Sequence, residues 1–98
     1  MKFGLTDEEI SLINGVFKQF PEVESVFIYG SRAKGNFKKT SDIDLAIRFA
    51  KGVAGSLAKI KSKLDDQPII YEIDVIDEAE IAAGNFKEEY CAAKLPFD

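Results

Sequence analysis

The chain has 98 residues, 46% of them apolar, which is the size and composition of one small globular domain. It has no histidine and one cysteine, which excludes His-based triads, His–Cys zinc sites and an internal disulfide. The net charge of −4 argues against binding a long nucleic acid through charge alone. No membrane span or signal peptide is recognisable, and the single cysteine fits a reducing compartment, so we expect a cytoplasmic protein.

The first predicted element is an amphipathic helix over about residues 7–19. Thr6 and Glu9 form a capping-box pattern at its start, apolar residues follow at helical spacing, and Pro21 ends it. Residues 23–29 are rich in Val, Phe, Ile and Tyr, which predicts a buried strand.

The middle of the chain predicts two further regular elements. After a short helical turn at residues 31–35 and a polar loop at 36–41, alternating residues indicate a second strand over 42–50. Apolar residues at helical spacing then predict a long helix over 52–66, which ends before Pro68.

The last third predicts a third strand over residues 69–76 and a helical tail that Asp77 caps and Gly84–Asn85 interrupts. This element order predicts a single α/β (α+β) domain over 1–98, with a small mixed sheet of three to four strands flanked by helices in two or three layers. We expect Cys91 to be buried and Tyr90 to be exposed. Taken as a group, the bulky side chains of the tail complete the core or form a partner-binding patch, with the core favoured, and they are Phe86, Tyr90, Leu95 and Phe97.

Two carboxylates stand at spacing i, i+2 in the second strand. Because successive side chains on a strand point to opposite faces, Asp42 and Asp44 share one face. Such a pair also fits a surface strand edge that carries acids. Asp74 favours a binding site, because an acid between Ile73 and Val75 is costly unless it is solvated or bound. If the third strand lies beside the second, three carboxylates meet and suit Mg²⁺.

The turn Gly30–Ser31 follows the first strand. Backbone N–H groups at a helix start favour an anion, glycine permits close approach of a phosphate, and the Ser31 hydroxyl can donate a hydrogen bond. An ordinary tight turn can contain the same two residues, and the sequence lacks the ending of a Walker A loop. Arg32, Lys38 and Lys39 would offset the charge of bound phosphates.

The phosphate turn and the acids together predict nucleotide chemistry. Two Mg²⁺ ions about 3.5–4 Å apart can activate an attacking hydroxyl and stabilise a leaving pyrophosphate. Asp42 and Asp44 would bridge both ions. Asp74 would hold the ion that activates the hydroxyl or would accept the hydroxyl proton directly, while Gly30–Ser31 would hold the β,γ-phosphates.

These motifs resemble the nucleotidyltransferase domain of the DNA polymerase β superfamily, and within it the minimal nucleotidyltransferases (MNT proteins). The family pattern joins Gly-Ser and a basic segment, Ser-Asp-x-Asp-Leu, and an Asp on a later strand, which match residues 30–35, 41–45 and Asp74. The resemblance implies a nucleotidyltransferase fold and Mg²⁺-dependent transfer of a nucleoside monophosphate, usually AMP from ATP, to a hydroxyl.

The resemblance also implies a protein partner. Many MNT proteins are similar to antitoxins that act on an α-helical HEPN protein, in some cases by adenylylating a tyrosine, and others pair with a helical-bundle protein. Because a chain of 98 residues leaves no second domain for a long acceptor, we expect dependence on a partner chain, and a homodimer is also compatible. The alternative is a non-catalytic nucleotide-binding module or antitoxin that occludes its partner. The three carboxylates favour the enzyme.

Overall fold

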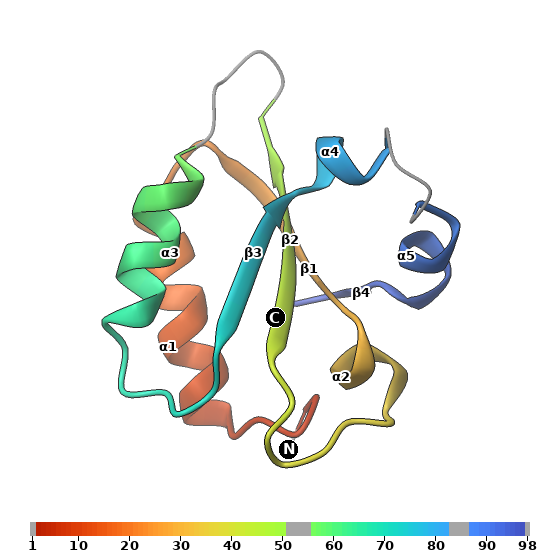
Figure 1. Ribbon diagram of the computed structural model, residues 1–98. Helices are drawn as coiled ribbons and strands as arrows, with labels where there is room; N and C mark the ends of the chain where they lie inside the picture. Colours follow the sequence, from red (N-terminus) through yellow and green to blue (C-terminus); the bar gives the residue numbers. More distant parts are fainter. Residues whose placement is uncertain (1, 51–55, 83–86, 98) are drawn as a thin grey trace.

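The computed structural model describes residues 2–50, 56–82 and 87–97 (Figure 1). Its elements, in chain order, are α1 (Asp7–Phe17), β1 (Val23–Tyr29), α2 (Ser31–Lys34), β2 (Ile43–Phe49), α3 (Leu57–Asp65), β3 (Ile73–Asp77), α4 (Glu78–Ala82), α5 (Lys87–Ala93) and β4 (Leu95–Pro96). None of the helices in these ranges is long and apolar enough to cross a membrane.

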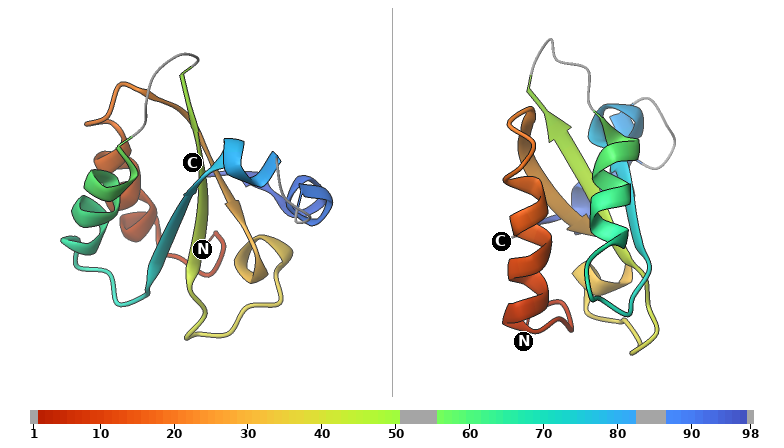
Figure 2. Two further views of the ribbon diagram at one scale, coloured as in Figure 1. Left: turned by 45° about the horizontal axis from the view of Figure 1, so that its top comes forward. Right: turned by 90° about the vertical axis from the view of Figure 1, so that its left-hand side faces the viewer.

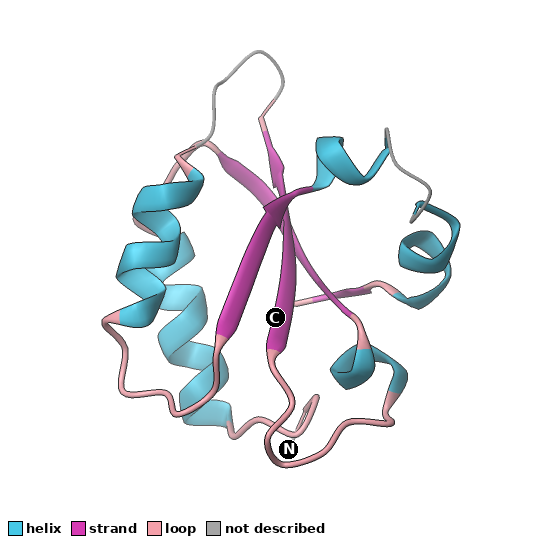
Figure 3. Cartoon of the chain, in the orientation of Figure 1, coloured by secondary structure: helices cyan, strands magenta, loops and turns pink. Residues whose placement is uncertain are grey.

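The four strands form one mixed sheet in the order β3-β2-β1-β4 (Figure 3). β1 pairs antiparallel with β2 on one side and with β4 on the other, whereas β2 and β3 run parallel. The parallel pair needs a crossover connection, and α3 provides it. The α+β class and the mixed sheet of three to four strands flanked by helices are therefore confirmed.

One face of the sheet carries the main core. Helices α1 and α3 lie side by side against this face (Figures 1 and 2). The inward residues of β2 are Ile43, Leu45 and Ile47, which are fully buried, and they meet Ile13 of α1 and Ile60 of α3. The alternation of β2 thus turns its apolar side chains to the core and its acids to the opposite face.

The opposite face carries a smaller apolar cluster beneath α4 and α5. Ala46, Ile81 and Tyr90 are buried there, and Phe27 and Tyr29 pack against them. The two helices occupy the side of the sheet away from α1 and α3 (Figure 2).

Most predicted elements are confirmed within a few residues, and the differences fall in the second half of the chain. The third strand begins at Ile73 rather than residue 69, and Ile70 is 89% exposed in the preceding loop. The pairing of β4 with β1 was not predicted. Two predictions were wrong, because Cys91 is exposed and Tyr90 is buried.

The other expectations about the tail have mixed outcomes. Phe97 completes the core, whereas Leu95 is exposed. Asp77 caps α4 as predicted, since its Oδ1 accepts a hydrogen bond from the Ala79 N–H at 2.9 Å. The start of the predicted helix at 52–55, the break at Gly84–Asn85 and Phe86 lie outside the described residues.

Glu78 joins the α4–α5 pair to the sheet. Its carboxylate accepts hydrogen bonds from Arg48 Nε at 2.7 Å and from the Tyr90 hydroxyl at 2.5 Å, and Lys94 Nζ lies 3.4 Å away. The cations Arg48 and Lys94 also lie 4.9 and 4.5 Å from the ring centroid of Phe27. Burial raises the pKa of Glu78, but the hydrogen bonds from Arg48 and Tyr90 outweigh it, so the net pKa is lowered.

The β1–α2 connection depends on Gly30. Its backbone has φ 75° and ψ −155°, a region that is open almost only to glycine. A Cβ at this position would lie 2.5 Å from the Asp44 carboxylate Oδ2. Glycine therefore permits both the turn and the close approach of Asp44.

We predict that Tyr90→Phe lowers the free energy of unfolding by about 1–2 kcal/mol at neutral pH, because a hydrogen bond to a charged carboxylate is lost. The lowered pKa of Glu78 means that the carboxylate stabilises the fold above its ordinary pKa of ~4.3 and that this contribution is lost as the pH falls through the folded-state value. Urea denaturation of both proteins at neutral and acidic pH should show a difference that shrinks in acid. Cys91→Ser, at an exposed position on the same helix, is the control.

We predict that Gly30→Ala destabilises the protein by about 1–3 kcal/mol and displaces the Asp44 side chain, because alanine is strained at this φ and its Cβ clashes with the carboxylate. The matched control is Gly15→Ala in α1, where a Cβ meets nothing within 4 Å and alanine should stabilise the helix by about 0.5–1 kcal/mol. Equal thermal midpoints for the two variants would contradict this account of the turn.

Candidate active site

The parallel register of β2 and β3 brings two of the three acids together. Asp44 and Asp74 are direct partners in this pairing, and both lie on the face opposite the main core. Asp42 immediately precedes β2, two residues before Asp44. Asp42 and Asp74 are exposed and Asp44 is half-buried. The expectation that the third strand lies beside the second is therefore confirmed.

The proximity of the acids affects the ionisation of Asp44. Its pKa is raised, first by burial and then by the negative charges of Asp74 and Asp42, while the positive charge of Arg32 opposes the shift. Like charges held side by side by a sheet register repel each other, and a bound cation would remove that repulsion.

The acids are a partial ligand set for a metal ion. Across the ranges that the structure describes, no three His, Cys, Asp or Glu side chains are grouped closely enough to hold a metal. Mg²⁺ is commonly bound by one or two carboxylates together with substrate phosphates and water, rather than by a complete protein cage. The oxygen donors of Asp44 and Asp74, with Asp42 close by, fit a site of this kind.

The Gly30–Ser31 turn lies next to these acids. The Asp44 carboxylate lies where a Cβ on Gly30 would stand, and Ser31 begins the short helix α2. Anything held by the backbone of this turn is therefore close to Asp44. The structure thus brings together the small-residue turn and the carboxylates that the sequence separates by more than ten positions.

Tyr29 borders the acids on the β1 side and directly precedes the Gly30–Ser31 turn. It is the β1 partner of Asp44, and its ring meets Tyr90 edge to face at a centroid distance of 5.6 Å. Burial, followed by the charges of Asp44 and Asp74, raises the pKa of Tyr29 to about 12. The tyrosine therefore stays neutral at physiological pH and forms part of the wall around the acids.

The three basic residues of the predicted site lie in different surroundings. Arg32 is only 2% exposed, and its guanidinium donates hydrogen bonds to backbone carbonyls of Ser41 and Phe3. This geometry favours a structural role over the phosphate contact expected from the sequence. Lys38 and Lys39 are exposed in the loop that leads to β2. The burial of Arg32 has no sequence signal, because it depends on contacts across 29 residues.

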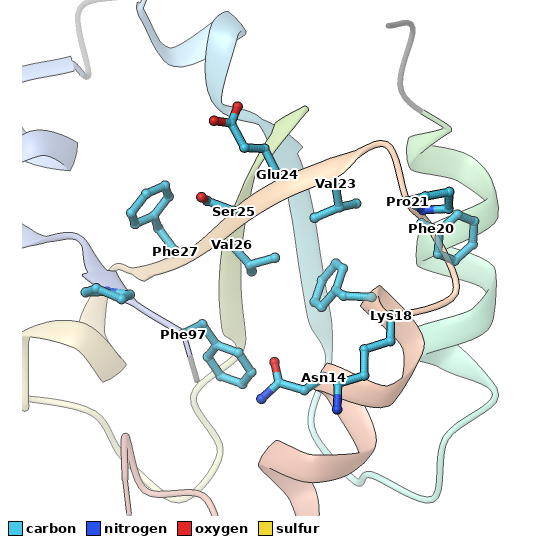
Figure 4. A pocket seen from close by; sticks show the side chains of 12 residues that line it. Asn14, Lys18, Phe20, Pro21, Val23, Glu24, Ser25, Val26, Phe27 and Phe97 are labelled. Atoms are coloured by element: carbon cyan, nitrogen blue, oxygen red, sulfur yellow. The ribbon is translucent and has the colours of Figure 1, made fainter. Parts of the chain in front are cut away.

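Two pockets lie outside the acidic cluster. One, of about 730 Å³, is lined by Phe20, Val26 and Phe97 among others, between the end of α1 and the outer side of β1 (Figure 4). The other, of about 700 Å³, is lined by aromatic residues, Arg32 and Lys39. Neither of these two pockets is lined by Asp42, Asp44 or Asp74.

Comparisons with known proteins identify the family of the chain. Residues 11–95 match the family described as "Polymerase beta, Nucleotidyltransferase". The "Probable protein adenylyltransferase MntA" of Haemophilus influenzae is 30% identical over 89 residues, which cover 89% of this chain and 76% of that protein.

Two solved structures have the same fold. A toxin–antitoxin structure with AMP-PNP contains a chain that superposes with a TM-score of 0.66 at 16% identity, covering 96% of this chain and 73% of that one. A candidate nucleotidyltransferase from Sulfolobus solfataricus gives a TM-score of 0.54 at 24% identity, covering 99% of this chain and 87% of that one. The match over most of the sequence, with the acids and the Gly-Ser turn in one place, shows that the chain belongs to the polymerase β-type nucleotidyltransferase family.

Proposed function

We propose that this protein is a Mg²⁺-dependent adenylyltransferase that transfers AMP from ATP to a hydroxyl group on a partner protein. The observation that carries the proposal is the in-register pair Asp44–Asp74 beside the Gly30–Ser31 turn. Nucleotidyl transfer needs negative oxygen ligands close to a place where phosphates bind, and the two acids beside the Gly30–Ser31 turn would meet that need.

Asp42, Asp44 and Asp74 would hold the Mg²⁺ ions. Bound there, the metal would supply Lewis-acid stabilisation of the phosphate oxygens. Asp44 is central among the acids, because it adjoins both Gly30 and Asp74. Asp74, which is exposed on the edge strand β3, would accept the proton of an incoming acceptor hydroxyl.

The remaining residues would bind and orient the nucleotide. The backbone and hydroxyl of Ser31 would hold the β,γ-phosphates near Asp44, and the exposed Lys38 and Lys39 would offset their negative charge. Tyr29, neutral at physiological pH, would limit access of water to one side of the acids.

Two comparisons support a protein acceptor. The Haemophilus relative is described as a protein adenylyltransferase, and one structural neighbour comes from a toxin–antitoxin complex with AMP-PNP. The exposed position of Asp74 also suits an acceptor delivered by another chain. We therefore propose that the protein acts as an antitoxin on a helical, HEPN-type partner.

We predict that the protein labels its partner when incubated with α-³²P-ATP, Mg²⁺ and the product of an adjacent open reading frame. Asp42→Asn, Asp44→Asn and Asp74→Asn should each reduce label transfer by roughly 100-fold or more, because each removes a negative charge that would hold the Mg²⁺ ions stabilising the transferring phosphate. Asp66→Asn, an exposed carboxylate at the end of α3, is the matched control and should label normally.

The partner must be tested in the same experiment for tight association. A stable complex that forms without label transfer, and that still forms with the three substitutions, would contradict the proposed enzymatic activity. It would favour inhibition of the partner by occlusion. Label transfer that is unaffected by Asp44→Asn would contradict the assignment of the site.

A further inference from the structure

Arg32 is a buried cation next to the phosphate turn. It follows Ser31 directly, yet its side chain points away from solvent and is only 2% exposed. None of the salt bridges found among the described residues involves it. Its charge instead meets backbone oxygens and aromatic rings, with the Tyr71 and Phe37 ring centroids 4.3 and 5.2 Å from its Cζ. Burying a charge in this way is costly unless all of its donors are satisfied.

Two of the donors converge on the residue before Asp42. Arg32 Nε and Nη2 donate to the same carbonyl oxygen, that of Ser41, at 3.1 and 2.8 Å. Ser41 immediately precedes Asp42 in the loop that enters β2. The planar guanidinium therefore fixes the distance between the helix that carries Ser31 and the peptide that carries Asp42.

The third donor reaches the N-terminal segment. Arg32 Nη1 donates to the Phe3 carbonyl oxygen at 2.8 Å. Phe3 and Gly4 form a tight turn, with φ values of 57° and 73°, that two hydrogen bonds between Lys2 and Leu5 close. Positive φ at both central residues is typical of a type I′ turn, and Phe3 is the only non-glycine residue with positive φ in the described ranges.

This turn is shaped to fit Arg32. A Cβ on Gly4 would lie 2.8 Å from Arg32 Nη1 and 2.3 Å from the Phe37 ring. The N-terminal turn, the loop before Asp42 and α2 are thus three separate segments that meet at one guanidinium.

We propose that Arg32 is a positioning residue that sets Asp42 relative to the Ser31 turn, and that the Phe3–Gly4 turn supports it. The inference rests on the proposed function, because Asp42 matters there as a metal ligand. Each of the three guanidinium nitrogens already donates a hydrogen bond to a backbone oxygen, and the side chain is only 2% exposed, so little of it is accessible to a phosphate at Ser31. Its contribution to transfer therefore passes through Asp42.

The test compares Arg32→Lys with wild type in the label-transfer assay. Lysine keeps the positive charge but cannot make the three hydrogen bonds of the planar guanidinium. We expect kcat to fall roughly 10-fold or more, because a displacement of ~1 Å at a catalytic group can lower the rate by 10²-fold. The KM for ATP should stay within about threefold, since ground-state binding is not removed. The Mg²⁺ concentration for half-maximal activity should rise roughly 10-fold, as for other changes that loosen a metal ligand.

Two further variants separate positioning from general destabilisation. Gly4→Ala disturbs Arg32 from the N-terminal side and should raise the Mg²⁺ requirement in the same direction. Arg48→Lys makes the same substitution on β2, at a residue bonded to Glu78, and should lower the thermal midpoint without changing the Mg²⁺ requirement. If Arg32→Lys behaves like Arg48→Lys, the inference is overturned.

Inorganic tripolyphosphate provides the contrasting outcome. Its affinity, measured by calorimetry, should be the same for wild type and Arg32→Lys. A loss of tripolyphosphate affinity together with a raised KM for ATP and an unchanged Mg²⁺ requirement would make Arg32 a phosphate ligand and overturn the inference.

Failure of the proposed function can be distinguished from failure of this inference. If wild type transfers no label, the proposed function falls, and Mn²⁺ binding followed by electron paramagnetic resonance still tests the positioning role. Wild type should then bind Mn²⁺ roughly 10-fold more tightly than Arg32→Lys. Equal affinities, or no Mn²⁺ binding by either protein, would overturn the inference.

Discussion

The parallel pairing of β2 with β3 is the constraint on which the candidate site depends. Ile43, Leu45 and Ile73 are all buried on the core side of these two strands. Because side chains alternate along a strand, burying them fixes the register, and Asp44 and Asp74 are then opposite each other. A slip of one residue would bring these acids into the core. The free energy of the core thus holds together two charges that repel.

The approach of the Gly30 turn is the second constraint, and it follows from the first. Once Asp44 is fixed on β2, its carboxylate occupies the volume that a side chain at position 30 would need. The position of the Asp44 carboxylate therefore requires glycine at position 30. Neighbouring carboxylates that repel each other destabilise the fold. Clusters of this kind are common at functional sites, so the geometry of these acids is informative about function.

Local patterns in the sequence predicted the elements well. Residues 23–29 are rich in β-branched and aromatic residues, and β1 has those bounds. The capping box at Thr6 is formed, and the acids of β2 and β3 lie on one face as the alternation required. For these features the physical cause is contained in a few neighbouring residues.

Features set by distant contacts could not be predicted in this way. Arg32 lies in a basic segment typical of phosphate binding, and only the carbonyls of Phe3 and Ser41 explain why it is buried. Tyr90 and Cys91 are adjacent, and the position of α5 over the sheet decides that Tyr90 is buried while Cys91 is exposed. The strand β4 has two residues, too few for a periodic signal.

Both edges of the sheet carry features that oppose the addition of another strand. On one side, Pro96 in β4 has no N–H to offer. On the other side, Lys61 donates to the Ile73 carbonyl, which points away from β2 because the preceding carbonyl, that of Glu72, already accepts the Ile43 N–H. Lysine and proline at sheet edges discourage aggregation through strand pairing. Strand pairing with a second copy of the chain is therefore disfavoured at both edges.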